Sequence, residues 1–260
     1  MRIGIFDSGL GGLLICHSLV AALPDYDYVY LGDTKRVPYG NRSQEAVFEF
    51  TCQAAQYLFE KEDCQLIIVA CNTASAEALR KVQQEWLPQH FPERRVLGVI
   101  VPTVEALGSL QEGDKVGILA TTSTVNSQAY PIEIAQRFPS LTVIQQAAPL
   151  LVPLIEHKGL QWAGPILDHY LEPLRDCAAI VLGCTHYAAI KDMVAERLPH
   201  AQIIAQDELI PASFKQYLGR HPETEILLGR GGGRHYLVTD LTENLPHFNS
   251  VDISLTEIAL

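Results

Sequence analysis

Short apolar runs rich in β-branched residues alternate with longer amphipathic stretches along the first two hundred residues. A short apolar run predicts a buried strand, and an amphipathic stretch between two such runs predicts a helix packed on the sheet. This alternation is typical of α/β proteins, in which successive βα units build mainly parallel sheets. We expect strands at residues 2–6, 27–31, 66–70, 96–100, 115–119, 141–144 and 178–182.

Residues 43–60 give the clearest helical pattern. Their apolar side chains recur at helical spacing, and Ser43 stands where an N-cap is expected. We predict a helix that packs one face on a sheet and serves as scaffold. The apolar positions are Ala46, Val47, Phe50, Ala54, Tyr57 and Leu58.

The chain matches itself when it is shifted by 113 residues. Residues 3–5 fall on 116–118, and residues 67–71 fall on 180–184, so that Cys71 coincides with Cys184. Apolar strands of α/β proteins resemble one another, but that does not account for two cysteines at one offset. We therefore predict a duplication that gives two similar βα-repeat domains.

The boundaries of the two domains follow from where the match begins and ends. We assign residues 1–95 and 206–260 to the first domain and residues 96–205 to the second. The tail from about residue 205 fits neither half, and we expect it to return to the first half with a strand at 236–239.

Cys71 and Cys184 each follow a predicted strand and precede a predicted helix. Ligands of parallel sheets bind at the carboxyl ends of the strands, and a helix N-terminus lowers a thiol pKa from about 8.5 toward neutrality. Two such thiols suit a reaction in which one group takes a proton from a stereocentre and the other returns one to the opposite face. We expect them to face each other across a cleft between the domains.

The other four cysteines are predicted to be structural. Cys64 and Cys177 also match at the offset, but seven residues of strand separate Cys64 from Cys71 by about 20 Å, too far for one metal ion. We therefore predict no metal site. Cys16 and Cys52 lie on apolar helix faces and are interpreted as core residues.

The composition limits the function further. The 260 residues include 30 acidic and 19 basic side chains, a formal net charge of −11, which argues against nucleic acid and anionic membranes as partners. No apolar run approaches the roughly 18 residues that span a bilayer. Six cysteines without short paired spacings fit a reducing cytoplasm. Because the net charge is negative, an anionic substrate would have to be held by hydrogen-bond donors within the binding site itself.

Four segments together resemble the glutamate racemase family, in that family's order. They are residues 4–12 (GIFDSGLGG), 30–34 with 38–40 (YLGDT and PYG), 70–74 (ACNTA) and 183–187 (GCTHY). The resemblance covers residues 3 to about 198. It implies cofactor-independent interconversion of L- and D-glutamate, which supplies D-glutamate for peptidoglycan.

The resemblance also assigns roles to residues. It implies that Cys71 deprotonates D-glutamate with help from Asp7, and that Cys184 deprotonates L-glutamate with help from His186 and Glu156. It implies a small-molecule substrate, no cofactor, and a possible homodimer. The implied substrate-binding residues are Asp7, Ser8, Tyr39, Gly40, Cys71, Asn72, Thr73, Thr121, Thr124, Cys184, Thr185 and His186.

Several alternatives stay open at this point. The same two-thiol chemistry would serve an aspartate or a hydantoin racemase, and a protein without catalysis that binds amino acids or inhibits a partner is a third interpretation. Helix capping explains Asn72, Thr73 and Thr185 as well as substrate binding does. The chain also has Ala188 and Ala189 where the family usually has Pro-Leu.

Overall fold

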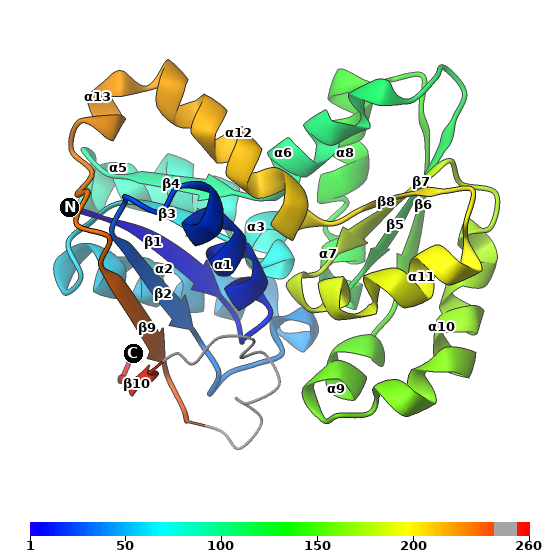
Figure 1. Ribbon diagram of the computed structural model, residues 1–260, viewed down its shortest axis with the longest axis horizontal. Helices are drawn as coiled ribbons and strands as arrows, with labels where there is room; N and C mark the ends of the chain where they lie inside the picture. Colours follow the sequence, from blue (N-terminus) through cyan, green and yellow to red (C-terminus); the bar gives the residue numbers. More distant parts are fainter. Residues whose placement is uncertain (242–253) are drawn as a thin grey trace.

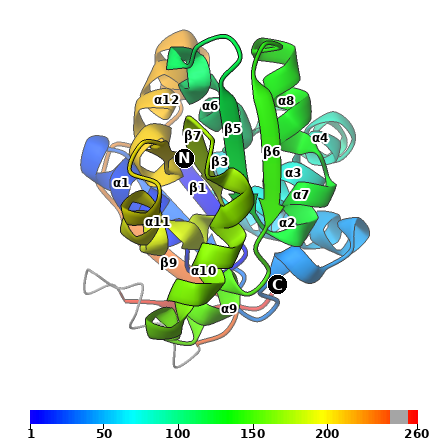
Figure 2. The ribbon, with the colours of Figure 1, turned by 90° about the vertical axis from the view of Figure 1, so that its right-hand side faces the viewer.

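The computed structural model describes residues 1–241 and 254–260 and contains two sheets in which every strand pair is parallel. The two sheets stand side by side, and each has helices on both faces (Figures 1 and 2). The predicted α/β class with parallel sheets is therefore confirmed. We call the part built on the six-stranded sheet the first lobe and the part built on the four-stranded sheet the second lobe.

The strands of the first lobe lie in the order β10-β9-β2-β1-β3-β4, and those of the second lobe in the order β6-β5-β7-β8. The first sheet comprises β1 (Arg2–Asp7), β2 (Tyr28–Gly32), β3 (Cys64–Val69), β4 (Arg95–Gly98), β9 (Arg234–Val238) and β10 (Thr256–Glu257); the second comprises β5 (Lys115–Ala120), β6 (Thr142–Ala147), β7 (Ala179–Gly183) and β8 (Gln202–Ile204).

The helices connect these strands, and short 3₁₀ turns such as Tyr39–Asn41 and Thr185–Ile190 stand between some of them. The α-helices are α1 (Gly12–Ala22), α2 (Gln44–Glu60), α3 (Asn72–Glu77), α4 (Leu79–Lys81), α5 (Leu87–His90), α6 (Ile100–Glu105), α7 (Thr122–Asn126), α8 (Ala129–Arg137), α9 (Leu151–Glu156), α10 (Ala163–Leu171), α11 (Lys191–Arg197), α12 (Gln206–Arg220) and α13 (Pro222–Glu225). Among the described residues, no helix combines the length and the apolar character needed to cross a membrane.

The two lobes repeat one strand pattern at the 113-residue offset. β1 lies between β2 and β3, and β5 lies between β6 and β7. Ile3 pairs with Leu66 in the first lobe, and Val116 pairs with Ala179 in the second. Both pairs keep the offset residue for residue, so the predicted duplication is confirmed in the register of the sheets.

Side-chain packing repeats as well. A Cβ on Gly4 would lie 3.2 Å from the sulfur of Cys64, and a Cβ on Gly117 would lie 3.3 Å from the sulfur of Cys177. Both glycines thus make room for a cysteine, Cys64 at the start of β3 and Cys177 just before β7. Cys64 and Cys177 are buried and form no disulfide, as expected for structural residues.

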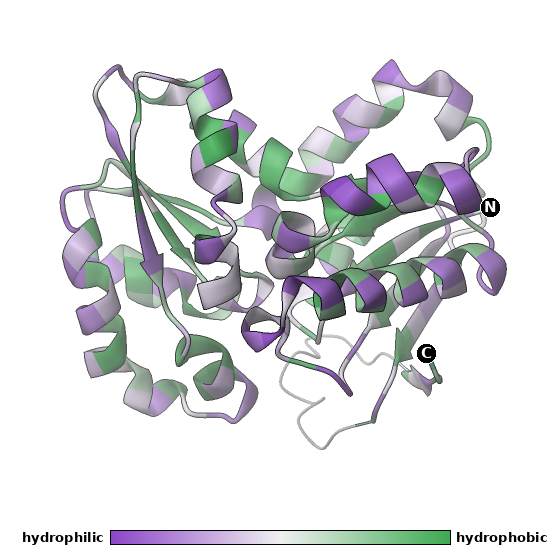
Figure 3. Ribbon diagram, turned by 180° about the vertical axis from the view of Figure 1, so that it is seen from behind, coloured by the Kyte–Doolittle hydropathy of each residue, from purple (hydrophilic) through white to green (hydrophobic). Residues whose placement is uncertain are grey.

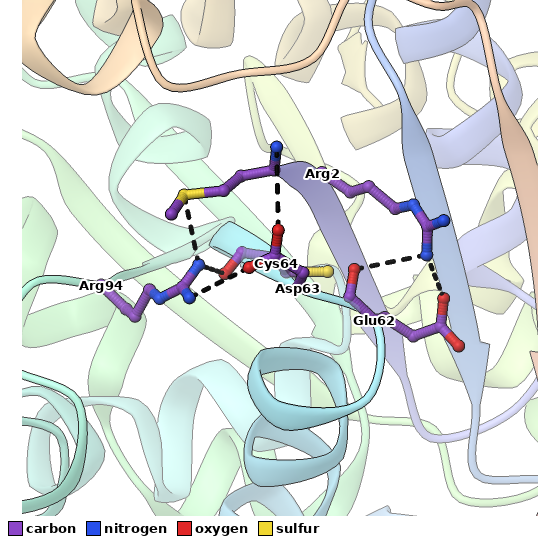
Figure 4. A network of polar contacts seen from close by, with 6 residues as sticks. Arg2, Glu62, Asp63, Cys64 and Arg94 are labelled. Carbon is purple, nitrogen blue, oxygen red and sulfur yellow. Dashed lines mark hydrogen bonds and ion pairs between the residues drawn. The ribbon is translucent and has the colours of Figure 1, made fainter.

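Polar contacts close the amino-terminal edge of the first sheet (Figure 4). Arg2 pairs with the Glu62 carboxylate at 2.6 Å, and Arg94 donates to the carbonyl of Cys64 at 2.6 Å and pairs with Asp63 at 3.1 Å. Cys64 therefore starts β3 at this edge, while Cys71 follows the opposite end of the same strand. That separation agrees with the prediction that these two thiols do not share a metal ion.

Most predicted elements are present, with shifted ends. The predicted helix at 43–60 is α2, whose N-cap Ser43 accepts a hydrogen bond from Ala46 N at 3.3 Å. The predicted strand at 236–239 is β9, and it pairs with β2, so the tail returns to the first lobe. The strand predicted at 96–100 ends at Gly98, because the chain turns there into α6.

Two segments cross between the lobes: the chain passes from β4 through α6 into the second lobe and returns from β8 through α12. These two helices contact each other and lie above the junction of the sheets in Figure 1. Hydrophobic residues dominate the inner strands, and hydrophilic residues gather on the outer helices (Figure 3). The assignment of 1–95 with 206–260 and of 96–205 to two domains stays a prediction, and residues 242–253 of it lie outside the described residues.

Candidate active site

Cys71 caps the first helix after β3. Its sulfur accepts a hydrogen bond from Ala74 N at 3.4 Å and donates one to the hydroxyl oxygen of Ser8 at 3.3 Å. Only 4% of the residue is exposed, and burial together with the nearby charge of Asp7 raises the pKa of the Cys71 thiol to about 12. The expectation of a lowered pKa is therefore wrong for Cys71, because burial outweighs the contribution of the helix N-terminus.

Cys184 occupies the equivalent place after β7, but its surroundings differ. The ring of His186 lies beside it, with Nδ1 3.7 Å from the sulfur, and Nε2 of the same ring is 2.5 Å from the carboxylate of Glu156. Burial by itself would lower the pKa of His186, but its hydrogen bonds to Cys184 and Glu156 and their negative charges raise it well above the usual value. The ring of His186 is thus held between the sulfur of Cys184 and the carboxylate of Glu156.

Asp7 ends β1 and reaches across to the second lobe. One carboxylate oxygen accepts hydrogen bonds from Gly9 N at 3.2 Å and Gly12 N at 3.1 Å, and the other accepts one from the hydroxyl of Thr185 at 3.2 Å. Burial raises the pKa of Asp7, although the charge of His186 and these hydrogen bonds act in the opposite direction. The carboxylate lies behind the cavity and holds the loop that carries Cys184.

Three threonine hydroxyls meet where the lobes face each other. Thr73 comes from α3 in the first lobe, and its oxygen lies 3.1 Å from that of Thr121 and 3.4 Å from that of Thr124 in the second lobe. Gly40 packs on the same group, since a Cβ there would stand 2.7 Å from the Cβ of Thr121. The close approach of the lobes therefore requires a glycine at position 40.

Tyr39 is held by a buried carboxylate that the sequence analysis did not single out. Its hydroxyl donates to Asp33 at 2.5 Å, and burial followed by the charge of Asp33 raises the pKa of Tyr39, which keeps the hydroxyl protonated. Asp33 also pairs with Arg36 at 2.6 Å and accepts a hydrogen bond from Thr239 at 2.8 Å. Thr239 directly follows β9, so the returning tail helps to fix Tyr39.

A small cavity of about 20 Å³ lies between the lobes, and both Cys71 and Cys184 line it. Val37, Pro38 and Val152 form the wall that it shares with a larger neighbouring cavity of about 220 Å³. The remaining residues around the small cavity are Ser8, Tyr39, Gly40, Asn72, Thr73, Thr121, Thr185 and His186.

Nearly all sequence-predicted site residues therefore gather around one cavity. Asp7, Thr124 and Glu156 do not line it, but each contacts a residue that does. No group of three or more His, Cys, Asp or Glu side chains within residues 1–241 and 254–260 could hold a metal ion.

The sequence analysis gave no role to Asp33 and did not select Val37, Val152 or Gln206. Asp33 stands in the YLGDT segment, which was the available signal. The apolar wall residues carry no signal that distinguishes them from core residues.

Comparison with known proteins identifies relatives over nearly the whole chain. The family model described as Asp/Glu/Hydantoin racemase matches residues 12–209. A protein named glutamate racemase from Paracoccus denitrificans is 38% identical over 254 residues, which cover 92% of each chain. The crystal structure of glutamate racemase from Francisella tularensis in complex with D-glutamate has a TM-score of 0.85 at 29% identity and covers 99% of this chain and 97% of its own. That of glutamate racemase from Thermus thermophilus with β-chloro-D-alanine has a TM-score of 0.83 at 33% identity and covers 100% and 97%.

Proposed function

Because the chain belongs to the Asp/Glu/hydantoin racemase family and is an amino-acid racemase, we propose that it interconverts L- and D-glutamate by proton transfer between two cysteines and the α-carbon. The observation that carries the proposal is that Cys71 and Cys184, at equivalent positions of the two lobes, line one cavity. A base on one side of a stereocentre and an acid on the other side are the minimum that inversion requires.

The two thiols have unequal surroundings. The pKa of about 12 keeps Cys71 protonated, whereas the sulfur of Cys184 lies 3.7 Å from Nδ1 of His186, a ring whose pKa is raised well above the usual value. In the L-to-D direction the Cys184 thiolate takes the α-proton, and the Cys71 thiol gives its proton to the opposite face. One proton leaves the α-carbon and one arrives, so that the reverse direction starts from Cys71 thiolate and Cys184 thiol.

The groups around the cavity suit a dicarboxylic amino acid. Hydroxyls of Ser8, Thr73, Thr121 and Thr185 and the amide of Asn72 are donors that hold carboxylates locally, as the net charge of −11 requires. The carboxylate of Asp7 favours a nearby ammonium group. A volume of about 20 Å³ accommodates about one water molecule, so the walls of the cavity must move apart when glutamate binds.

Isotope exchange in D₂O tests the proposal. Purified protein is incubated with L-glutamate and no added cofactor, and it is expected to produce D-glutamate that carries deuterium at the α-carbon. Chiral separation followed by mass spectrometry measures this product. Cys71→Ser and Cys184→Ser are each expected to abolish racemisation, because an alcohol forms far too little alkoxide near neutral pH. Cys64→Ser is the matched control, since Cys64 is a buried free thiol at the opposite sheet edge, and it is expected to retain activity.

The exchange experiment also separates the alternatives. Faster labelling of aspartate or a hydantoin than of glutamate would favour a different racemase, and binding of glutamate without any labelling would favour a protein without catalysis. Full activity in either active-site serine variant would contradict the two-cysteine mechanism.

The cellular role we propose is the supply of D-glutamate for peptidoglycan in the cytoplasm. The proposal rests on the glutamate racemase relatives and on the six free cysteines. Expression of the chain in a bacterium that requires D-glutamate is expected to restore growth without the supplement. Expression of the Cys184→Ser variant is expected to leave the requirement in place.

A further inference from the structure

A buried pair of side-chain amides lies directly behind the cavity. Asn72 Nδ2 donates to Gln206 Oε1 at 2.7 Å, and Gln206 Nε2 donates to Asn72 Oδ1 at 2.8 Å. Only 2% of Asn72 and 4% of Gln206 are exposed. Asn72 follows Cys71 and lines the cavity, whereas Gln206 begins α12, the helix that returns from the second lobe.

The direction of these hydrogen bonds is fixed from α6, the other crossing helix. The Thr103 hydroxyl gives its proton to the carbonyl of Val99 at 2.6 Å, so its oxygen can only accept from Gln206, whose Nε2 lies 3.1 Å away. The nitrogen end of Gln206 must therefore face Thr103. Its oxygen end must then face Asn72 Nδ2.

Tyr130 of α8 fixes the other end of the Asn72 amide. Its hydroxyl donates to Asn72 Oδ1 at 2.7 Å, and burial raises the pKa of Tyr130, which keeps that proton in place. Both donors to Oδ1, Tyr130 and Gln206, lie outside the lining of the cavity. Nδ2 carries two protons, and within the described part of the chain it forms one hydrogen bond, the one to Gln206.

We propose that Gln206 and Thr103 are positioning residues that lock the Asn72 amide with an N–H toward the cavity. An Asn72 amide held in this orientation favours a ligand that presents a hydrogen-bond acceptor to Nδ2, as a carboxylate does, and disfavours a ligand that presents a donor to it. This inference rests on the proposed glutamate racemase function. It also ties the orientation of a substrate-binding group to the two segments that join the lobes, because Thr103 lies on α6 and Gln206 on α12.

Kinetics of substituted enzymes test this positioning role. Gln206→Met keeps the length of the side chain but removes its hydrogen bonds to Asn72, Thr103 and Tyr130. It is expected to raise the KM for glutamate about three- to tenfold, the range that loss of one hydrogen bond to the substrate gives, with kcat changed less than twofold. Thr103→Val removes the hydroxyl that sets the direction and is expected to raise the KM by a smaller factor. Thr103→Ser restores the hydroxyl and is expected to return the KM to the wild-type value.

Gln65→Met is the matched control. Gln65 is 4% exposed and donates one hydrogen bond to the carbonyl of Glu93 at 2.9 Å, near the end of β3 far from Cys71. This variant is expected to lose stability without a change in KM. The inference is overturned if wild-type protein racemises glutamate and Gln206→Met raises the KM no more than Gln65→Met does, or if Thr103→Ser behaves like Thr103→Val. Absence of racemisation in the wild type would overturn the proposed function instead.

Discussion

The contact between Gly11 and the loop after Cys184 allows a sharp test of how closely the lobes must fit. Gly11 precedes α1 with a φ of −58°, a value open to any residue, so the backbone does not require glycine there. The space around it does require glycine, because a Cβ on Gly11 would lie 2.7 Å from Oγ1 of Thr185 and 2.8 Å from the backbone nitrogen of His186. We therefore expect Gly11→Ala to push the lobes apart.

The size of the effect follows from these distances. Ordinary contact begins near 3.4 Å, so the loop must move by about 0.7 Å, which stretches the 3.2 Å hydrogen bond from Thr185 to Asp7 beyond hydrogen-bonding distance. Overpacking of this kind costs about 1–3 kcal/mol of the free energy of unfolding. A displacement approaching 1 Å next to Cys184 is expected to lower kcat/KM by about 10- to 100-fold.

Urea unfolding and racemisation measured on the same preparation check both numbers. Gly219→Ala is the control, because no atom lies within 4 Å of a Cβ at this position near the end of α12. That variant is expected to gain up to about 1 kcal/mol from helix propensity and to keep wild-type activity. Wild-type stability and kcat/KM in Gly11→Ala would refute the argument that the lobes meet at van der Waals distance here.

Three further predictions concern buried charges. Because burial raises the pKa of Asp7, its ionised form costs stability that grows as pH rises through that pKa, so Asp7→Asn is expected to unfold at higher urea than wild type at pH 8 while racemisation falls. The raised pKa of His186 contributes stability that is complete below about pH 6.5 and is lost as the pH rises through the pKa of His186 in the folded state. Urea titrations from pH 6 to 10 are expected to show this loss of stability in wild type but not in His186→Asn. Asp33→Asn leaves Arg36 without its ion-pair partner and is expected to cost about 3 kcal/mol in urea unfolding and to raise the KM, since an amide accepts on one oxygen only and cannot accept from both Tyr39 and Thr239.

Regular patterns in the sequence predicted the frame of the molecule. The 113-residue offset that links Cys71 to Cys184 also fixes the strand register, because a strand whose two faces are buried tolerates no slip. β8 and β10 were not predicted. Each is short, and the exposed Gln202 and Thr256 give them no apolar run.

Interactions between distant positions could not be predicted. Asn72 and Gln206 are 134 residues apart, and Asp33 and Thr239 are 206 residues apart, so that neither hydrogen bond has a local pattern in the sequence. The predicted lowering of the Cys71 thiol pKa was wrong for a related reason. A helix N-terminus is visible in the sequence, whereas the burial that removes water from the thiol is a property of the assembled lobes.

Duplication placed two equivalent thiols at the cavity, but the groups that support them are not equivalent. Ser8 contacts Cys71, whereas His186 and Glu156 form a charged chain beside Cys184. Such asymmetry is compatible with the reaction we propose, in which each thiol acts as base in one direction and as acid in the other. The proposed reaction requires that only one thiol carries the proton at a time. The different neighbours of the two sulfur atoms suit this requirement, because two thiolates at one cavity would repel each other and two thiols would leave no base.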